Sequence, residues 1–385
     1  MKILFFSWGN PYLKTTWSIV PFCFSNALRK NGHEVIGYNL NSHIKISRFW
    51  DKYVTRYMKK LFRNCQYEFL RTISARFLAN RIIKSAVKRH PDADVCIFTT
   101  FSFYNKRKNI PSILFCDWTY ESWLERIGHT PFFFEKHFIN KERECLKNAD
   151  ICVSLFPEAA HKINEQLEYH KVIWGGVSAV NIVDSSEFDN NNILKQSVHS
   201  NKILFIGDGK YLEGAKLLLQ AFKLLKRRNT QLELHIIGLQ ANQLIDIKEK
   251  TDGIYFYGYL SKDKPSDCEI YYEQLRSAAV FCNPTEIWGG FSSTIEAMFY
   301  YTPIVVSPYV DFVAQFGEKI NFGKYNLSFK AEALAYNIEC ILKASTKQRT
   351  DMCKASHHAV ANCNWETYSA KILQLLNCTK FHLNS

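Results

Sequence analysis

The sequence predicts an α/β protein made of two doubly wound domains, each with a parallel sheet covered by helices. A unit of strand, glycine-containing loop, helix and strand opens each half of the chain, once at Lys2 and again at Lys202. Residues 184–192 between the halves are polar, lack periodicity and are typical of a linker. We therefore expect a first domain over residues 1–183, a linker over 184–200 and a second domain over 201–364.

The first half begins with the apolar strand Lys2–Ser7, followed by a glycine-containing loop and a helix over about Trp17–Asn31. Gly32 ends this helix, because glycine readily adopts the left-handed conformation that follows a helix C-terminus, and the next strand starts at once. Short apolar runs bounded by turn residues predict further strands. They are Asp94–Thr99, Ser112–Cys116, Ile151–Leu155 and Lys171–Trp174.

The second half repeats this order, and its last part has a helical pattern from Lys330 to Leu376, with Trp365 near the start of the last helix. Its opening unit consists of strand Lys202–Ile206, loop Gly207–Gly214, helix Ala215–Arg228 and strand Leu232–Ile237. The remaining predicted strands are Ile254–Tyr257, Val280–Cys282 and Ile304–Ser307.

Composition excludes several classes of protein. No apolar run reaches the 18 or more residues of a membrane-spanning helix. Residues 1–9 carry one lysine and a short apolar run, so they predict a strand rather than a signal peptide. The twelve cysteines include no CxxC pair and lie mostly in apolar stretches. They predict reduced core thiols of a cytoplasmic protein, neither a disulfide framework nor a zinc site.

The net charge of +13 is concentrated in residues 48–90, which contain twelve Lys or Arg and two acidic residues and so carry +10. Trp50, Tyr53 and Tyr57 recur in this segment at helical spacing. A basic helix with an aromatic face favours a membrane-surface segment attracted to anionic lipid. A solvated helix whose aromatic rings fill the core is an equal alternative. No nucleic-acid-binding motif accompanies the charge, so we expect no nucleic acid partner.

The segment Asn283–Met298 carries the clearest functional signal. It runs from an apolar strand through a glycine-containing turn into a short helix closed by Pro303. The free N–H groups and partial positive charge of a helix N-terminus suit a phosphate, and Glu296 could accept hydrogen bonds from sugar hydroxyls. Residues 293–296 also match a capping box, in which Ser293 and Glu296 satisfy each other's backbone N–H groups. Spacing alone favours the capping box, whereas the context favours a nucleotide-sugar pocket.

In this context the chain resembles the family 4 retaining glycosyltransferases of the GT-B fold over nearly its whole length. Several segments match in order, and the ordered set is more specific than any one of them. They are Asn26–Val35, Val172–Val177, Ile203–Gly207, Leu218–Phe222, Tyr257–Leu260, Tyr271–Tyr272, Phe281–Pro284, Glu296–Met298, Thr302–Val305 and Asn364–Tyr368.

The resemblance implies two Rossmann-like domains facing across a cleft, with a C-terminal helix over about 365–385 packing back on the first domain. It implies transfer with retention of configuration, a nucleotide-sugar donor on the second domain, an acceptor on the first, and no cofactor or metal. Asp92-Ala-Asp94 matches a metal-binding DxD pattern, but its place before a strand favours a turn. The implied donor-binding residues are Gly9, Gly207, Gly209, Lys210, Gly258, Gly290, Phe291, Ser292, Ser293, Thr294 and Glu296.

Three positions depart from the family pattern. The family usually has two glutamates separated by seven residues, and counting back from Glu296 reaches Trp288, so Glu286 is the candidate for the first, catalytic, glutamate. The usual Arg and Lys of the phosphate loop align with Asp208 and Glu213. Because phosphate contacts need cationic or N–H partners, Lys210 and the backbone of residues 207–209 become the candidates, with Lys216 in reserve.

On the acceptor side, Asp117 follows a predicted strand, where binding groups gather in open α/β sheets. It is the candidate to orient or deprotonate an acceptor hydroxyl, although an Asp there also caps turns. We predict a cytoplasmic glycosyltransferase with a glycan or lipid-linked acceptor, at the inner membrane face if residues 48–90 bind lipid. A nucleotide-sugar epimerase or phosphorylase, and a non-catalytic binding protein, are the alternatives.

Overall fold

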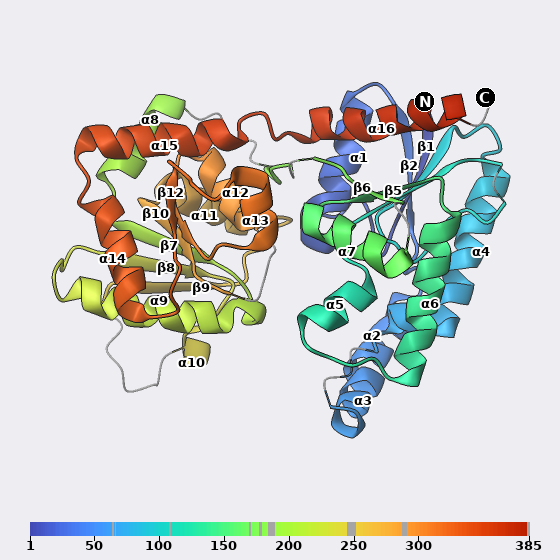
Figure 1. Cartoon of the computed structure of the whole chain (residues 1–385), viewed down its shortest axis with the longest axis horizontal. Coiled ribbons are helices and arrows are strands. Elements are labelled where there is room, and N and C mark those ends of the chain that lie inside the picture. The colour runs from blue at the N-terminus through green and yellow to red at the C-terminus, as the bar shows by residue number, and fades with distance from the viewer. Residues whose placement is uncertain are drawn as a thin grey trace. The chain divides into compact units, whose positions relative to one another are not determined.

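The computed structural model describes the chain except residues 64, 66, 108, 169–170, 177–178, 184–188, 245–251, 287–290 and 383–385. Its contacts divide the chain into two compact units (Figure 1). Unit 1 comprises Met1–Ala179 and Trp365–Ser385, and unit 2 comprises Val180–Asn364. Each unit contains one six-stranded sheet, and the strand pairs are parallel, as the alternation of strands and helices predicted.

The sheet of unit 1 has the order β2-β1-β3-β4-β5-β6, which is a doubly wound arrangement. Its strands are β1 (Lys2–Ser7), β2 (Glu34–Asn39), β3 (Val95–Phe98), β4 (Ser112–Cys116), β5 (Ile151–Ser154) and β6 (Val172–Trp174). Its helices are α1 (Val20–Lys30), α2 (Ile44–Phe49), α3 (Thr55–Leu61), α4 (Ile73–Arg89), α5 (Tyr120–Arg126), α6 (Phe133–Asn148), α7 (Pro157–Leu167) and α16 (Trp365–His382).

Successive side chains of β1 enter different layers of unit 1, because they alternate between the two faces of a strand. Leu4 and Phe6 belong to the cluster that includes residues of α4, α6 and α7. Phe5 meets Phe24 of α1 edge to face, with ring centroids 5.5 Å apart. Trp365 of α16 in turn stacks on Phe24 at 5.4 Å, so the C-terminal helix completes this layer of unit 1.

The sheet of unit 2 has the order β12-β11-β10-β7-β8-β9. Apolar residues of α9 and α14 pack in one cluster with those of β7, β8 and β10, while α11, α12, α8 and α15 contact one another. The strands are β7 (Lys202–Ile206), β8 (Glu233–Ile237), β9 (Ile254–Gly258), β10 (Val280–Asn283), β11 (Ile304–Val306) and β12 (Gly323–Tyr325). The helices are α8 (Asn190–His199), α9 (Leu212–Lys226), α10 (Ala241–Leu244), α11 (Pro265–Arg276), α12 (Ser292–Phe299), α13 (Val310–Phe316), α14 (Ala331–Leu342) and α15 (Thr346–Val360).

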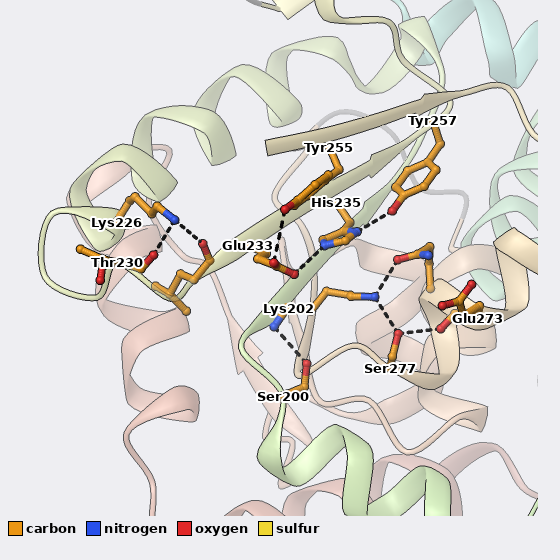
Figure 2. A network of polar contacts seen from close by, with 12 residues as sticks. Ser200, Lys202, Lys226, Thr230, Glu233, His235, Tyr255, Tyr257, Glu273 and Ser277 are labelled. Carbon is orange, nitrogen blue, oxygen red and sulfur yellow. Dashed lines mark hydrogen bonds and ion pairs between the residues drawn. The ribbon is translucent and has the colours of Figure 1, made fainter. Parts of the chain in front are cut away.

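A polar network occupies the β7–β9 side of the sheet in unit 2 (Figure 2). His235 of β8 is buried, with Nδ1 2.8 Å from the Tyr257 hydroxyl and Nε2 3.2 Å from Glu233 Oε2. Its ring stacks on Tyr255 at 4.6 Å. Burial and the nearby Lys202 lower the pKa of His235, whereas Glu233 opposes this change.

The predicted strands are confirmed to within one residue at either end, but three other boundaries were wrong. Helix α1 begins at Val20 rather than Trp17, because Pro21 has no N–H and fits only the first turn of a helix. Residues 190–199 of the predicted linker form α8, with Asp189 as its cap. The predicted loop 207–214 turns into helix from Gly209, so that Gly214 lies inside α9. Strand β12 was not predicted, since three residues that include Gly323 give no periodic signal.

A continuous helix opens the basic segment of residues 48–90 and begins just before it. It is formed by α2, a π-helical turn over Trp50–Val54, and α3. One side packs on the rest of unit 1, where Trp50 Nε1 donates to the Tyr67 carbonyl at 3.3 Å. The opposite side exposes a row of large apolar side chains, so Trp50 does not share a face with Tyr53 and Tyr57 as expected. We call this row the exposed stripe; it consists of Ile46 (51% exposed), Phe49 (61%), Tyr53 (53%), Tyr57 (61%) and Leu61 (58%).

Candidate functional site

The chain reverses direction within the sheet of unit 2 between β7 and β10. It winds outwards from β7 to β8 and β9, then returns to β10 on the other side of β7 and winds on to β11 and β12. Ligands of open α/β sheets bind outside the carboxyl ends of the strands at such a switch point. The loop after β7 and the loop that leads from β10 to α12 both start there.

Glu296 of α12 is buried, with 3% of its side chain exposed, and its carboxylate accepts hydrogen bonds from other segments instead of capping the helix. Its Oε2 accepts hydrogen bonds from Lys262 Nζ and the Tyr271 hydroxyl, each at 2.8 Å. Its Oε1 receives only a longer contact of 3.3 Å from Ser292 Oγ among the contacts described. The N-cap of α12 is Phe291, with no side-chain cap hydrogen bond, so the capping-box interpretation of Ser293 and Glu296 was wrong.

Lys262 and Asn181 complete this network, and sequence reasoning missed both. Lys262 Nζ also donates to the Asn181 carbonyl at 3.2 Å and lies 4.5 Å from the centroid of the Tyr271 ring. Asn181 Nδ2 donates to Ser292 Oγ at 3.0 Å. Neither residue belongs to a recognisable motif, because the turn after β9 and the segment before α8 have no regular pattern. Only Tyr271 carried a signal, through its place in the approach to the donor site.

The other predicted residues around α12 lie in different environments. Phe291 is buried and packs edge to face on Phe312 at 5.3 Å, so its ring belongs to the core. Thr294 is also buried, whereas Ser293 is partly exposed at the helix start. Glu286 is exposed, three residues beyond the end of β10, and does not reach Glu296 through any contact described. Trp288 and Gly290 lie outside the described residues.

The loop after β7 contains two acids with local partners. Asp208 caps the following helical turn, since its Oδ1 accepts from the Lys210 N–H at 3.0 Å. Its carboxylate therefore occupies a backbone donor that a phosphate would otherwise use. Glu213 pairs with Lys216 at 2.7 Å on the surface. Lys210 itself is exposed. In this loop, therefore, one backbone donor is bonded to Asp208, and the reserve candidate Lys216 is paired with Glu213.

Three glycines, Gly207, Gly238 and Gly258, lie at the carboxyl ends of the neighbouring strands β7, β8 and β9. Gly238 has φ of 99° and Gly258 has φ of 63°, values that favour glycine. The Gly238 N–H donates to the Gly258 carbonyl at 2.7 Å, and a Cβ at Gly238 would collide with the Gly207 carbonyl. Gly238 was not predicted, although a glycine directly after a strand is a usable signal. A Cβ on Gly209 would meet nothing within 4 Å, so the backbone there is open to approach.

In unit 1, Asp117 follows the carboxyl end of β4, as predicted. Its Oδ1 accepts from the Trp118 N–H at 2.8 Å and from the Cys116 thiol at 3.3 Å. Burial raises the pKa of the Asp117 carboxyl, and these bonds, with one from the Trp17 side chain, oppose the rise. A carboxylate with a raised pKa is a better general base near neutral pH than an ordinary one.

The loop between β1 and α1 is strained. Gly9 has φ of 119°, and its N–H donates to Asn39 Oδ1 at 3.1 Å. Trp17, Ser18 and Ile19 have φ of 35°, 51° and 70°. Left-handed conformations cost about 1–3 kcal/mol for each non-glycine residue and are concentrated at functional sites. Sequence reasoning missed this turn, because none of the three residues favours a positive φ.

Other features do not add to the site. Asp92 and Asp94 both bind Lys2 at the start of β1, which supports the turn interpretation of the DxD pattern. A hollow of about 550 Å³ lies beyond the opposite end of α12, lined by Tyr301 and residues of α15. Within the described ranges, no cluster of three or more His, Cys, Asp or Glu side chains could hold a metal ion. No described helix is long and apolar enough to cross a membrane.

Comparisons with known proteins agree with this architecture. Residues 200–344 match the family model described as glycosyl transferases group 1. The chain is similar in structure to sucrose-phosphate synthase from Thermosynechococcus elongatus, with a TM-score of 0.69, 14% identity and coverage of 100% of both chains. It is also similar to WaaG, a glycosyltransferase involved in lipopolysaccharide biosynthesis (TM-score 0.60, 11% identity, coverage of 96% of this chain and 98% of WaaG). Anabaena HepE, solved with UDP-glucose, gives a TM-score of 0.59 at 13% identity, with coverage of 98% and 100%.

No curated protein sequence matches the chain. At these identities the solved structures establish the fold, and the matched family model covers β7 to α14 with the switch point and α12. Residues 200–344, which make up most of unit 2, therefore match the glycosyl transferases group 1 model, and the chain as a whole has the GT-B fold.

Proposed function

We propose that the protein transfers a sugar from a nucleoside diphosphate sugar to a glycan or lipid-linked acceptor, with retention of configuration and without a metal. The bond between the anomeric carbon and the diphosphate oxygen breaks, and that carbon bonds to the acceptor oxygen on the same face. The acceptor hydroxyl loses its proton. Such a reaction needs positive dipoles near the leaving diphosphate and a group that orients the acceptor.

The observation that carries the proposal is the buried Glu296 one turn into α12, at the switch point of a domain that matches the glycosyltransferase model. The N–H groups at the start of α12 and of Gly209 are the donors offered to the diphosphate, whereas the Gly207 N–H donates to the Ile237 carbonyl and the Lys210 N–H to Asp208. The carboxylate of Glu296 accepts hydrogen bonds from sugar hydroxyls. Asp117, with its raised pKa, orients or deprotonates the acceptor.

A thermal-shift screen against uridine, guanosine and adenosine diphosphates and their sugars tests donor binding. A ligand at 100 times its Kd stabilises the folded protein by about 2.7 kcal/mol, so even weak binding raises Tm measurably. We expect one nucleotide series to raise Tm in the wild type and to raise it less in Glu296→Gln. Turnover of the bound sugar nucleotide is then followed with added acceptors. If no nucleotide sugar in the panel binds or is consumed, the enzymatic proposal fails.

We further propose that the exposed stripe docks on an anionic membrane and brings the enzyme to a lipid-linked acceptor. The stripe repeats at intervals of three or four residues, so its five side chains lie along one side of a helix. Exposed basic residues, Lys45, Arg48, Lys52, Arg56, Lys59 and Lys60, stand between them. A helix of this kind lies in the membrane interface, where rings enter the headgroup region and cations attract anionic lipid. WaaG, with the same fold, serves lipopolysaccharide biosynthesis.

Sedimentation with vesicles tests this docking. We expect binding to vesicles that contain phosphatidylglycerol, weaker binding at high salt, and weak binding to phosphatidylcholine alone. The double variant Tyr53→Ser, Tyr57→Ser removes two exposed rings and should weaken binding about tenfold, since each loses apolar contact with lipid. Tyr336→Ser, which removes a ring 65% exposed in unit 2, is the matched control. Equal binding of wild type and double variant would exclude the stripe as the docking surface.

The acids at 208 and 213 favour a second candidate, a non-catalytic protein that binds nucleotide sugars. Asp208 occupies a backbone donor of the loop, and Glu213 neutralises Lys216. This candidate predicts donor binding without turnover in the presence of any acceptor or membrane. An epimerase would instead convert the sugar nucleotide without an acceptor, so product analysis separates the three.

A further inference from the structure

Lys262 is a largely covered cation in a turn, where a lysine side chain is normally exposed. It lies in the turn between β9 and α11, yet only 13% of its side chain is exposed. Its ammonium group is 2.8 Å from Glu296 Oε2 and 3.2 Å from the Asn181 carbonyl. The rings of Tyr271 and Tyr272 lie 4.5 and 5.4 Å from it. A lysine that gives up its hydration in this way needs a compensating partner, and Glu296 is that partner.

The two oxygens of Glu296 have different environments. Oε2 accepts two short hydrogen bonds, a charge-assisted one from the Lys262 ammonium group and one from the Tyr271 hydroxyl. Among the residues that the structure describes, Oε1 has one contact, at 3.3 Å from Ser292 Oγ, which is long for a hydroxyl donor to a carboxylate. A carboxylate offers about four lone-pair positions, so Oε1 keeps the capacity for a further donor. The Lys262 and Tyr271 contacts thus fix the carboxylate through one oxygen and leave the other for a ligand.

We propose that Lys262 is a positioning residue: it holds Glu296 in the orientation in which Oε1 receives a hydroxyl of the nucleotide-sugar donor. The proposal rests on the donor role given above to Glu296. Lys262 acts through Glu296 and need not touch the donor. A carboxylate displaced by about 1 Å loses on the order of a hundredfold in rate, so the effect of removing Lys262 is large.

The test is a double-mutant cycle, measured as kcat/KM and as KM for the sugar nucleotide that the wild type consumes, with UDP-glucose as the first probe. Lys262→Met should lose about a hundredfold in kcat/KM, chiefly through KM, and Lys262→Arg should recover at least about tenfold of this loss. In a Glu296→Gln background, Lys262→Met should change kcat/KM by less than about threefold, because the two residues act as a unit.

Two further variants separate positioning from folding. Lys264→Met removes a lysine from the same turn that is 72% exposed and should keep wild-type kinetics. Tyr271→Phe deletes one donor to Oε2 and leaves the charge pair intact, so it should show a smaller loss in the same direction even if Lys262→Met does not fold. Wild-type kinetics in both Lys262→Met and Tyr271→Phe, or equal losses for Lys262→Met with and without Glu296, would overturn the proposal. A wild type that consumes no sugar nucleotide would instead refute the proposed function, and with it the role given to Lys262.

Discussion

Gly214 lies where the segment after β7 packs against the segment after β10, and replacing it with alanine tests how tightly the two segments are packed. Gly214 lies within α9 and is buried. A Cβ there would collide with Thr285 Oγ1, and would lie 2.9 Å from the Thr285 nitrogen and 3.1 Å from its Cα. Thr285 is buried and donates through Oγ1 to Asn283 Oδ1 at 2.7 Å. The substitution therefore presses on the backbone of the segment that leads to Glu286.

Two effects of Gly214→Ala oppose each other. Alanine is favoured over glycine inside a helix by about 1 kcal/mol. Overpacking a filled site costs about 1–3 kcal/mol, and loss of the Thr285 hydrogen bond adds about 1 kcal/mol. Because two of the three close contacts are with backbone atoms, which cannot rotate away, we expect the cost to exceed the gain. The net result is a destabilisation of about 2 kcal/mol, or a Tm lower by about 4–8 °C for a unit of this size.

Thermal unfolding followed by tryptophan fluorescence measures this change, with a urea titration to obtain the free energy. Gly209→Ala is the matched control in the same loop, because its Cβ would meet nothing within 4 Å and its φ lies outside the left-handed region. That variant should be neutral or more stable by about 0.4–1 kcal/mol. A Gly214→Ala protein as stable as Gly209→Ala would refute the close packing of these two loops.

Two further substitutions test local stability and its dependence on pH. Thr72 caps α4, with Oγ1 accepting from the Ala75 N–H at 3.1 Å, so Thr72→Ala should lower the free energy of unfolding by about 1 kcal/mol in urea titrations. Thr350→Ala, at a partly exposed position within α15, should change it by less than about 0.5 kcal/mol, and equal effects would contradict the cap. Because the pKa of His235 is lowered in the folded state, the unfolded chain binds the extra proton. The free energy of unfolding of the wild type should therefore fall as pH drops below about 6.5, by at most about 1.4 kcal/mol per pH unit from this residue. The His235→Gln variant should lose less over the same pH range. Parallel pH profiles of the two proteins would argue against a buried neutral imidazole.

The regular parts of both sheets could be predicted from the sequence, because buried parallel strands form short apolar runs between turn residues. Residues such as Ile203–Phe205 and Val280–Cys282 are fully buried, and their neighbours in the chain give clear boundaries. Short or interrupted elements gave no such signal. Strand β12 has three residues, and α8 begins within a polar run whose helical start depends on the Asp189 cap.

The candidate site was predicted only where one chain segment contains it. The helix that starts at Ser292, with Glu296 in its second turn, was expected from the order of residues 283–298. The hydrogen-bond network around Glu296 was not expected, since Lys262, Tyr271 and, through Lys262 and Ser292, Asn181 come from other segments of the chain. The same spacing of Ser293 and Glu296 allowed a capping box, and only the structure excluded it, because α12 has Phe291 as its N-cap and no side-chain cap hydrogen bond.

The sequence by itself determined the two parallel sheets, the order of their strands along the chain and the position of the helix start at the switch point, because these follow from local periodicity and turn chemistry. The tertiary structure alone decided which charges are buried together and which are exposed. It placed Lys262 against Glu296, turned Asp208 into a helix cap, and separated Trp50 from the exposed stripe. Desolvation and pairing of charges depend on distances between remote segments, and a single sequence contains no record of those distances.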